Sequence, residues 1–294
     1  MSNTLIIAEA GVNHNGCFEL ACQLVDVAKE AGADIVKFQT FKAEKLVTAE
    51  AEKAKYQKET TQAQESQYHM LKRLELSYDE FHQLKAYCDK ANIQFLSTAF
   101  DEDSLKFLVN ELKIEFLKIP SGEITNAPFL LAHARTGKKI ILSTGMASLA
   151  DIERALGVIA FGYTTAEHER PCSQAFMNAY SSTAGIEALQ EKVTILHCTT
   201  EYPAPLEEIN LRAMNSIASS FNLAVGYSDH SAGIAVATAA TALGASIIEK
   251  HFTLDHNYPG PDHWFSEDQS GLRIWIESIR KSYTMLGEPT VRPT

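Results

Sequence analysis

The segment 223–262 decides the fold of this chain. It reads LAVGYSDH (223–230), SAGIAVATAATALGA (231–245), SIIEKHF (246–252) and TLDHNYPGPD (253–262). Two short apolar runs flank a helical stretch of small residues, which is the pattern of a β–α–β unit in a parallel sheet. Because parallel strands point the same way, His230 and His251 fall at the same edge of the sheet. Neighbouring strands lie about 4.8 Å apart, close enough for two imidazoles to bind one ion.

Carboxylates accompany these histidines. Asp229, Glu249 and Asp262 lie near them in the sequence, and Glu249 shares a strand face with His251 by the two-residue alternation. Either histidine alone is more often a polar loop residue than a ligand. Taken together, the five residues favour a divalent metal site, and the alternative of two histidines that never meet stays open here.

Length and composition bound the class of protein. A chain of 294 residues with 45% hydrophobic residues can bury a large core. The net charge of −11 argues against nucleic acid or an anionic membrane as partner. No apolar run approaches the roughly 20 residues of a membrane span, and the N-terminus lacks a basic signal region. We therefore expect a cytoplasmic protein whose five cysteines, none in a CxxC pair, are reduced.

Outside this segment, short β-branched runs alternate with helical segments along the whole chain. The eight expected strands are 5–8, 34–38, 94–97, 115–119, 139–142, 193–197, 223–227 and 246–250. A doubly wound open sheet could be written from the same pattern. The count of eight and the chain length favour an α/β fold of the (β/α)8 TIM-barrel type, with one catalytic domain over residues 1–288.

Two connections interrupt this alternation of strands and helices. Residues 40–76 are long and rich in Lys, Glu and Gln, too charged for a core, and are expected to form a mobile lid over the barrel mouth. Residues 162–185 are polar and show no clear periodicity. We expect the latter to be an irregular excursion.

In such barrels the active site lies at the C-terminal ends of the strands, and polar residues are dense there. Lys37 and Lys118 each sit inside an otherwise apolar strand, where an unpaired buried charge is costly. With Ser121, Ser143 and Ser228 nearby, they predict a site for a phosphate or carboxylate. The Ser-Gly and Ser-Thr-Gly sequences would let backbone amides approach that anion. The alternative is two solvated lysines on the outer face.

Two further residues, Glu123 and Tyr202, have two interpretations each, and a third, His197, has a structural one. Glu123 is a candidate general acid or base, or a charge at the start of a helix. Tyr202 is a packing residue of its loop or a wall on which a sugar stacks. His197 is better explained as a hydrogen-bonded barrel residue than as a ligand.

The strand-end motifs together resemble one known family. AEAGVNHNG, KFQTF, FLSTAFD, LKIPSGE, ILSTGM, LHCTTEYPAP, GYSDHS, EKHFT and PGPDH occur in this order from about Ile6 to Asp262. They resemble the sialic acid (nonulosonic acid) synthases. The resemblance implies a TIM-barrel transferase that condenses phosphoenolpyruvate with an N-acetylated mannosamine-type sugar, giving a nonulosonic acid and phosphate. It also implies a divalent metal, Mn2+ typically, with Mg2+ or Co2+ as alternatives.

The resemblance assigns roles to individual positions. His230 and His251 match the metal ligands, and Glu123 the catalytic carboxylate. The remaining matches are substrate contacts: Lys37, Thr98, Lys118, Ser121, Ser143 and Ser228 for phosphoenolpyruvate, and Gln39, Tyr202 and Asp262 for the sugar. Lys118 counts with Glu123 as catalytic, and Thr200 also falls at the substrates.

The chain departs from the family pattern in places. Asn15 stands where some members carry glutamate, and Thr200 where several carry asparagine. The CTTEYPAP form and the segment 162–185 are more similar to the bacterial legionaminate-type branch. Family members usually continue into a small antifreeze-like domain whose arginine caps the partner subunit's site. We therefore expect residues 289–294 to begin a linker to such a domain, and we expect a homodimer.

Two other functions remain open at this point. One is a Schiff-base aldolase that uses Lys118 or Lys37 on the same barrel. The other is a non-catalytic barrel that binds a sugar phosphate.

Overall fold

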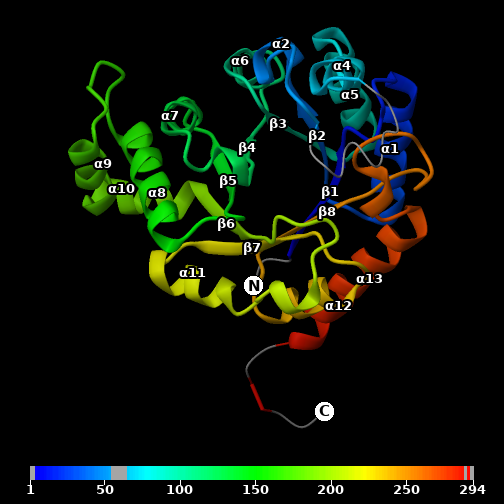
Figure 1. The fold of residues 1–294 in the computed structure, drawn as a ribbon. Coiled ribbons are helices and arrows are strands. Elements are labelled where there is room, and N and C mark those ends of the chain that lie inside the picture. Colours follow the sequence, from blue (N-terminus) through cyan, green and yellow to red (C-terminus); the bar gives the residue numbers. More distant parts are fainter. Residues whose placement is uncertain (1–3, 54–64, 288–289, 292–294) are drawn as a thin grey trace.

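A closed barrel of eight parallel strands forms the centre of the molecule, and helices surround it (Figure 1). The computed structural model describes residues 4–53, 65–287 and 290–291. The strands, neighbours in sequence order around the barrel, are β1 (Leu5–Gly11), β2 (Ile35–Thr40), β3 (Gln94–Ala99), β4 (Phe116–Ile119), β5 (Lys139–Ser143), β6 (Val193–His197), β7 (Ala224–Asp229) and β8 (Ile247–His251). The closure of β8 onto β1 confirms the predicted TIM barrel and excludes the open sheet.

The helices follow the strands in alternation. They are α1 (Phe18–Ala31), α2 (Ala43–Leu46), α4 (Gln67–Leu74), α5 (Tyr78–Ala91), α6 (Glu102–Asn110), α7 (Ala127–Arg135), α8 (Leu149–Thr164), α9 (Ser173–Ser181), α10 (Thr183–Lys192), α11 (Ala213–Phe221), α12 (Ala235–Ala242) and α13 (Gln269–Leu286). Short 3-10 turns cover Ser121–Glu123, Leu206–Glu208 and His263–Phe265. Local signals set several boundaries: Ser77 and Glu80 form a capping box at the start of α5, and Gly32 ends α1 in the left-handed conformation.

All eight predicted strands exist, and most extend further at their C-terminal ends than expected. The register shows that the added residues at these strand ends are paired within the sheet. Glu9 is paired in register with Lys37, Gln39 with Thr98, and Thr98 with Lys118. These polar side chains belong to the sheet itself and not to the loops that follow it, so the sheet fixes their positions.

The expected irregular excursion at 162–185 is wrong. Helix α8 runs on to Thr164, and α9 and α10 occupy most of the remaining segment. The side chain of Ser182 accepts a hydrogen bond from the Gly185 amide and so caps α10. The rings of Phe176 and Phe161 meet edge to face at 5.2 Å, which fixes α9 against α8. Short helices with small apolar faces give too little periodicity to be recognised from sequence.

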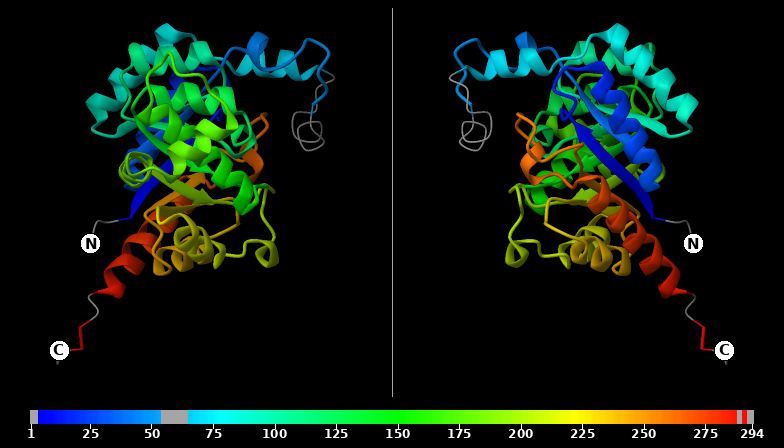
Figure 2. Two further views of the ribbon diagram at one scale, coloured as in Figure 1. Left: turned by 90° about the vertical axis from the view of Figure 1, so that its left-hand side faces the viewer. Right: turned by 90° about the vertical axis from the view of Figure 1, so that its right-hand side faces the viewer.

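The two ends of the described chain lie on the side of the barrel where the strands begin (Figure 2). Arg280 in α13 donates hydrogen bonds of 2.7 Å to the Thr4 carbonyl and to the Asp34 carboxylate. Asp34 in turn accepts a 2.7 Å bond from the Ile6 amide. This ion pair therefore closes the barrel at the end opposite the strand C-termini. Within the described residues, no helix has the length and apolar character needed to cross a bilayer.

Candidate active site

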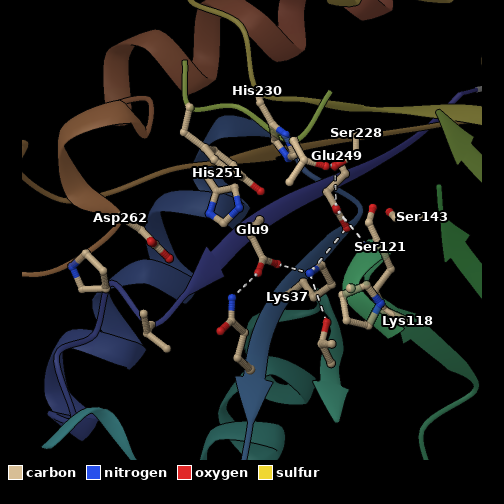
Figure 3. Close-up of a pocket in the computed structure, with 18 of the residues that line it drawn as sticks. Glu9, Lys37, Lys118, Ser121, Ser143, Ser228, His230, Glu249, His251 and Asp262 are labelled. Carbon is tan, nitrogen blue, oxygen red and sulfur yellow. Dashed lines mark hydrogen bonds and ion pairs between the residues drawn. The ribbon is translucent and has the colours of Figure 1, made fainter. Parts of the chain in front are cut away.

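A cavity of about 320 Å³ opens where the strands end (Figure 3). Twelve of the thirteen residues predicted for the site line it: Lys37, Gln39, Thr98, Lys118, Ser121, Ser143, Thr200, Tyr202, Ser228, His230, His251 and Asp262. They come from seven of the eight strands, β2 to β8, or from the loops directly after them. The structure thus gathers into one cavity residues that are up to 225 positions apart (Lys37 to Asp262) in the sequence.

Two lysines and two glutamates form the charged floor of this cavity, which we call the inner cluster: Glu9, Lys37, Lys118 and Glu249. Lys37 Nζ lies 2.5 Å from Glu9 Oε2 and 3.5 Å from Glu249 Oε2. Lys118 Nζ lies 3.3 Å from Glu249 Oε1. All four side chains are buried. Both lysines therefore point into the barrel, and the alternative of two solvated lysines on the outer face is wrong.

The inner cluster shifts the ionisation of its members. Burial raises the pKa of Glu249, but Lys118 and Lys37 outweigh burial and hold that pKa at about 2. Burial lowers the pKa of Lys37, but Glu249 and Glu9 outweigh it and the net pKa is raised. The pKa of Glu9 is raised, by burial first and by the charge on Glu249, against the pull of Lys37. Both lysines thus lie within ion-pair distance of a carboxylate on the floor of the cavity.

Hydroxyl groups surround this floor. Ser228 donates a 3.0 Å hydrogen bond to Glu249, and Ser121 accepts one of 2.8 Å from the Gly145 amide. Ser143 Oγ is buried and has no hydrogen-bond partner among the described residues. A side chain at Gly145 would collide with the Thr200 hydroxyl, which explains the glycine there. Its amide is already used by Ser121, so the expected contact of this amide with an anion is not available in this arrangement.

His230 and His251 face each other beside the inner cluster, with ring centroids 6.0 Å apart. The Thr199 carbonyl lies 2.6 Å from His230 Nδ1, and a carbonyl only accepts, so Nδ1 carries the proton and Nε2 keeps its lone pair. Burial lowers the pKa of His230, and burial first, with the proximity of His230 and Lys37, lowers the pKa of His251 well below its usual value. Both rings are therefore neutral at pH 7.

Neutral imidazoles are the form that ligates metals, and the His251 Nδ1 atom is buried without a hydrogen-bond partner in the described part of the chain. The donor set therefore fits a divalent cation. Among the described residues there is no group of three or more His, Cys, Asp or Glu side chains that could hold a metal ion. The protein would thus supply these two ligands and leave the other positions open.

Of the three carboxylates expected beside the histidines, two face the cavity and one does not. Glu249 and Asp262 line the cavity. Burial, with the charge on Glu9, raises the pKa of Asp262 to about 7, so this carboxyl group can hold a proton at neutral pH. Asp229 is not among the described residues that line the cavity, and its carboxylate binds Lys250 and Trp275 on the other side of the sheet. The expectation for Asp229 is therefore wrong, because adjacent strand residues face opposite ways.

An aromatic wall stands next to the imidazoles. The Tyr202 ring lies 4.2 Å from the His230 ring and 4.6 Å from the Phe265 ring, centroid to centroid. Tyr202 and Phe265 also line the cavity. Tyr202 therefore packs against rings from two other segments and lines the cavity, and its contact with a sugar stays a prediction.

Comparison with known proteins agrees with this geometry. The model of the NeuB family matches residues 24–290. The chain is 48% identical to an N,N'-diacetyllegionaminic acid synthase of Campylobacter jejuni, over 98% of this chain and 79% of that protein. It is 44% identical to a protein of the same name from Legionella pneumophila, over 98% and 75%. The solved N-acetylneuraminic acid synthetase of Leptospira borgpetersenii, in complex with citrate, superposes with a TM-score of 0.77 at 31% identity, over 100% and 88%.

This chain belongs to the NeuB family. The resemblance inferred from the strand-end motifs is confirmed, and so is the class of enzyme, an N-acetylneuraminate synthase-like transferase. The roles of individual residues remain predictions, for which the geometry above gives positions and contacts.

The cavity of this NeuB chain is also lined by residues that were given no role from the sequence. Glu9 completes the inner cluster, and its place at the end of the first strand was the available signal. Met70 and Leu74 of α4 line the cavity and are buried with Val12 and Phe41. The view that residues 40–76 are too charged for a core is therefore wrong for α4. The part of the expected lid at 54–64 lies outside the described residues.

Glu123 is the predicted site residue that the structure leaves apart. Its carboxylate accepts a 2.7 Å hydrogen bond from the Asn126 side chain, and it is not among the described residues that line the cavity. His197, by contrast, is explained as expected, because its Nε2 donates a 2.8 Å bond to the Ile209 carbonyl. Asn15 Oδ1 lies 3.2 Å from His263 Nε2, so this departure from the family pattern joins the first and last loops around the cavity.

Proposed function

We propose that this NeuB-family chain condenses phosphoenolpyruvate with an N-acetylated mannosamine-type sugar and releases a nonulosonic acid and phosphate. The observation that carries the proposal is the pair of buried lysines, Lys37 and Lys118, at the floor of a cavity with two neutral imidazoles on its wall. The names of the relatives support a product of the legionaminic or sialic acid class.

The lysines and hydroxyls would bind the anionic substrate. Phosphoenolpyruvate carries a phosphate and a carboxylate, and two ammonium groups with the Thr98 and Ser143 hydroxyls offer donors for both. Ser228 would join them once its hydroxyl turns from Glu249 to the substrate. The unpartnered Ser143 hydroxyl is available for such a bond. Glu249 keeps the ammonium groups in place before the substrate arrives, which reduces the reorganisation that binding requires.

The bond changes follow from the reactants. Carbon C3 of the enol attacks the sugar aldehyde and forms the new carbon–carbon bond. Water adds at C2, and the bond between C2 and the phosphate oxygen breaks, leaving a 2-keto acid and inorganic phosphate. Asp262, with its pKa of about 7, can hold or release a proton at its carboxyl group beside the sugar. Gln39, Tyr202 and Asp262 would orient the sugar.

His230 and His251 would hold a divalent cation, Mn2+ in the first instance. When bound, such an ion supplies Lewis-acid polarisation of a carbonyl oxygen. The chain's own contribution is to keep both rings neutral and to fix the His230 tautomer through the Thr199 carbonyl.

The Schiff-base alternative is disfavoured by the state of Lys37. A lysine nucleophile needs a lowered pKa, whereas carboxylates raise the pKa of Lys37 despite its burial. Lys118 is likewise paired with Glu249. Both lysines are therefore arranged to bind an anion.

The test measures phosphate release from phosphoenolpyruvate with a panel of N-acetylated aminosugars, with Mn2+ or with a chelator. We expect phosphate release that requires both the sugar and the metal. Tight sugar binding without phosphate release would favour the non-catalytic barrel. Trapping of substrate on a lysine by borohydride, with activity unaffected by chelators, would favour the aldolase.

A further inference from the structure

A second buried ion pair lies behind the two imidazoles, on the opposite face of the sheet. Lys250 Nζ is 3.2 Å from Asp229 Oδ2, and both side chains are buried. Asp229 directly precedes His230, and Lys250 directly precedes His251. Because side chains alternate along a strand, this pair faces the helices while the imidazoles face the cavity.

Further side chains, all buried except the partly buried Glu267, complete what we call the outer network: Asp229, Ser231, Lys250, Glu267 and Trp275. Asp229 accepts hydrogen bonds from the Trp275 indole (3.1 Å) and from the amide (3.0 Å) and hydroxyl (2.6 Å) of Ser231. Lys250 also donates to the Ser231 carbonyl and lies 3.7 Å from Glu267 Oε1. The charged groups of Asp229 and Lys250 are thus fully engaged within the protein.

The outer network joins three segments around the histidines. Ser231 lies just after β7, Lys250 in β8, and Glu267 on the chain that enters α13. The Glu267 amide donates a 2.9 Å bond to the His251 carbonyl, and the Glu267 carboxylate accepts one of 3.3 Å from the Gly233 amide. The network therefore fixes the main chain on both sides of the imidazoles.

The register between β7 and β8 ends at this pair, while His251 still pairs with Glu9 of β1. The register between β7 and β8 runs through Tyr227 with Ile248, Ser228 with Glu249, and finally Asp229 with Lys250. His230 and His251 lie one residue beyond the last registered pair. Main-chain bonds to β1 and Glu267 hold His251 and one from Ala204 holds His230, and the ion pair adds a side-chain link between the ends of β7 and β8 themselves.

We propose that Asp229 and Lys250 are positioning residues that fix the separation of His230 and His251 for cation binding. The inference rests on the proposed metal site. Neither residue is among the described residues that line the cavity, so neither would touch a substrate. A buried ion pair is weak evidence for stability, because apolar residues of similar volume often replace it without loss. Its geometric effect is more specific, since it permits one register at the strand ends.

The experiment compares three proteins: wild type, the double variant Asp229→Asn/Lys250→Met, and the control Asp34→Asn. The double variant removes both charges, so no uncompensated charge stays buried. The control breaks the Asp34–Arg280 ion pair, 2.7 Å long and partly buried, at the other end of the barrel. Mn2+ affinity is measured on the metal-free proteins by electron paramagnetic resonance of free Mn2+, and thermal unfolding is followed in parallel.

We expect the double variant to bind Mn2+ about 10- to 100-fold more weakly, the range known for lost support of a metal ligand. The control should keep wild-type affinity within about 2-fold, whatever its change in melting temperature. Wild-type affinity in a folded double variant would overturn the proposal. So would an equal loss in the control, because a general loosening would then explain both.

If the double variant does not fold, Lys250→Arg serves in its place. It retains the charge, but its planar head differs in shape from an ammonium group. We expect a loss of Mn2+ affinity of about 3-fold or more, and unchanged affinity would overturn the proposal. His230→Ala separates the two hypotheses: if wild type and His230→Ala bind Mn2+ equally, the metal site itself is wrong, whereas a loss in His230→Ala alone refutes only the positioning role.

Discussion

The inner cluster and the outer network are both groups of charged residues inside the same barrel. They differ in whether the polar atoms around them have hydrogen-bond partners. On the cavity side, Ser143 Oγ and His251 Nδ1 have no hydrogen-bond partner within the described chain. On the helix side, the Asp229 carboxylate and the Lys250 ammonium each have several partners. Unpartnered buried polar atoms are costly. Ser143 and His251 both line the cavity, so a bound ligand could supply the partners that these two atoms lack.

The largest effect is expected at the imidazoles. His230→Ala or His251→Ala removes one of two protein donors to the cation. Mn2+ affinity should fall by more than the roughly 10- to 100-fold that lost support of a ligand costs. Calorimetric titration of the metal-free variants measures this. Unchanged Mn2+ binding in both variants would mean that the unpartnered polar atoms on the cavity side bind another ligand.

The next effect distinguishes two buried lysines on opposite faces. Lys118→Met removes one charged donor from the cavity floor and should weaken phosphoenolpyruvate binding by about 10- to 150-fold, the equivalent of about 1.5–3 kcal/mol. The double variant Asp229→Asn/Lys250→Met is its matched control, since it also removes a buried lysine that is paired with a carboxylate and leaves no buried charge unpaired. We expect it to leave phosphoenolpyruvate affinity nearly intact. The reverse pattern in titration of both variants would exchange the roles of the two faces.

A smaller effect concerns pH. The pKa of Asp262 is about 7 in the folded protein and about 3.8 in the unfolded chain. Between these values the folded state binds more protons than the unfolded state, so stability should fall as pH rises from about 4 to 7. We expect about 1–2 kcal/mol, because Asp262 borders the open cavity.

Asp262→Asn cannot titrate and should lose this part of the pH dependence. Urea unfolding of both proteins at pH 5 and pH 8 measures the difference. A wild-type protein that gains stability relative to the variant over this interval would contradict the raised pKa.

The smallest effect is expected at Glu123. Its carboxylate is engaged by Asn126 outside the cavity. Glu123→Gln should therefore change kcat/KM by less than about 5-fold, equivalent to the weak exposed bond that is lost. A loss of 100-fold or more in steady-state assays would show that Glu123 turns into the site when substrates bind, and that its predicted catalytic role is right.

Much of the site was predictable because successive side chains of a strand point to opposite faces of the sheet. Lys37 with Gln39, and Glu249 with His251, share cavity-facing positions for this reason. The same rule places Asp229 and Lys250 on the other face, and the expectation for Asp229 failed because it considered nearness in sequence and not alternation. The charge pairing of Glu9 with Lys37 depends on the register between β1 and β2, which no local pattern specifies.

The wall formed by α4 was beyond sequence reasoning. Met70 and Leu74 lie in a segment whose charged residues dominate its composition, and their burial depends on Val12 and Phe41 from two other loops. Such contacts join segments that are distant in the chain. Local periodicity carries no information about them, which is why tertiary packing overrides composition here.

The burial of Trp275 has a practical consequence. The chain has two tryptophans, and the other, Trp264, is 41% exposed next to the cavity-lining residue Phe265. The two indoles are therefore built-in optical reporters with opposite solvent access. A soluble quencher such as acrylamide should dim the emission of Trp264 while sparing that of Trp275. Ligand arrival at the cavity rim and loosening of the strand ends behind it could then be followed separately in one unlabelled sample.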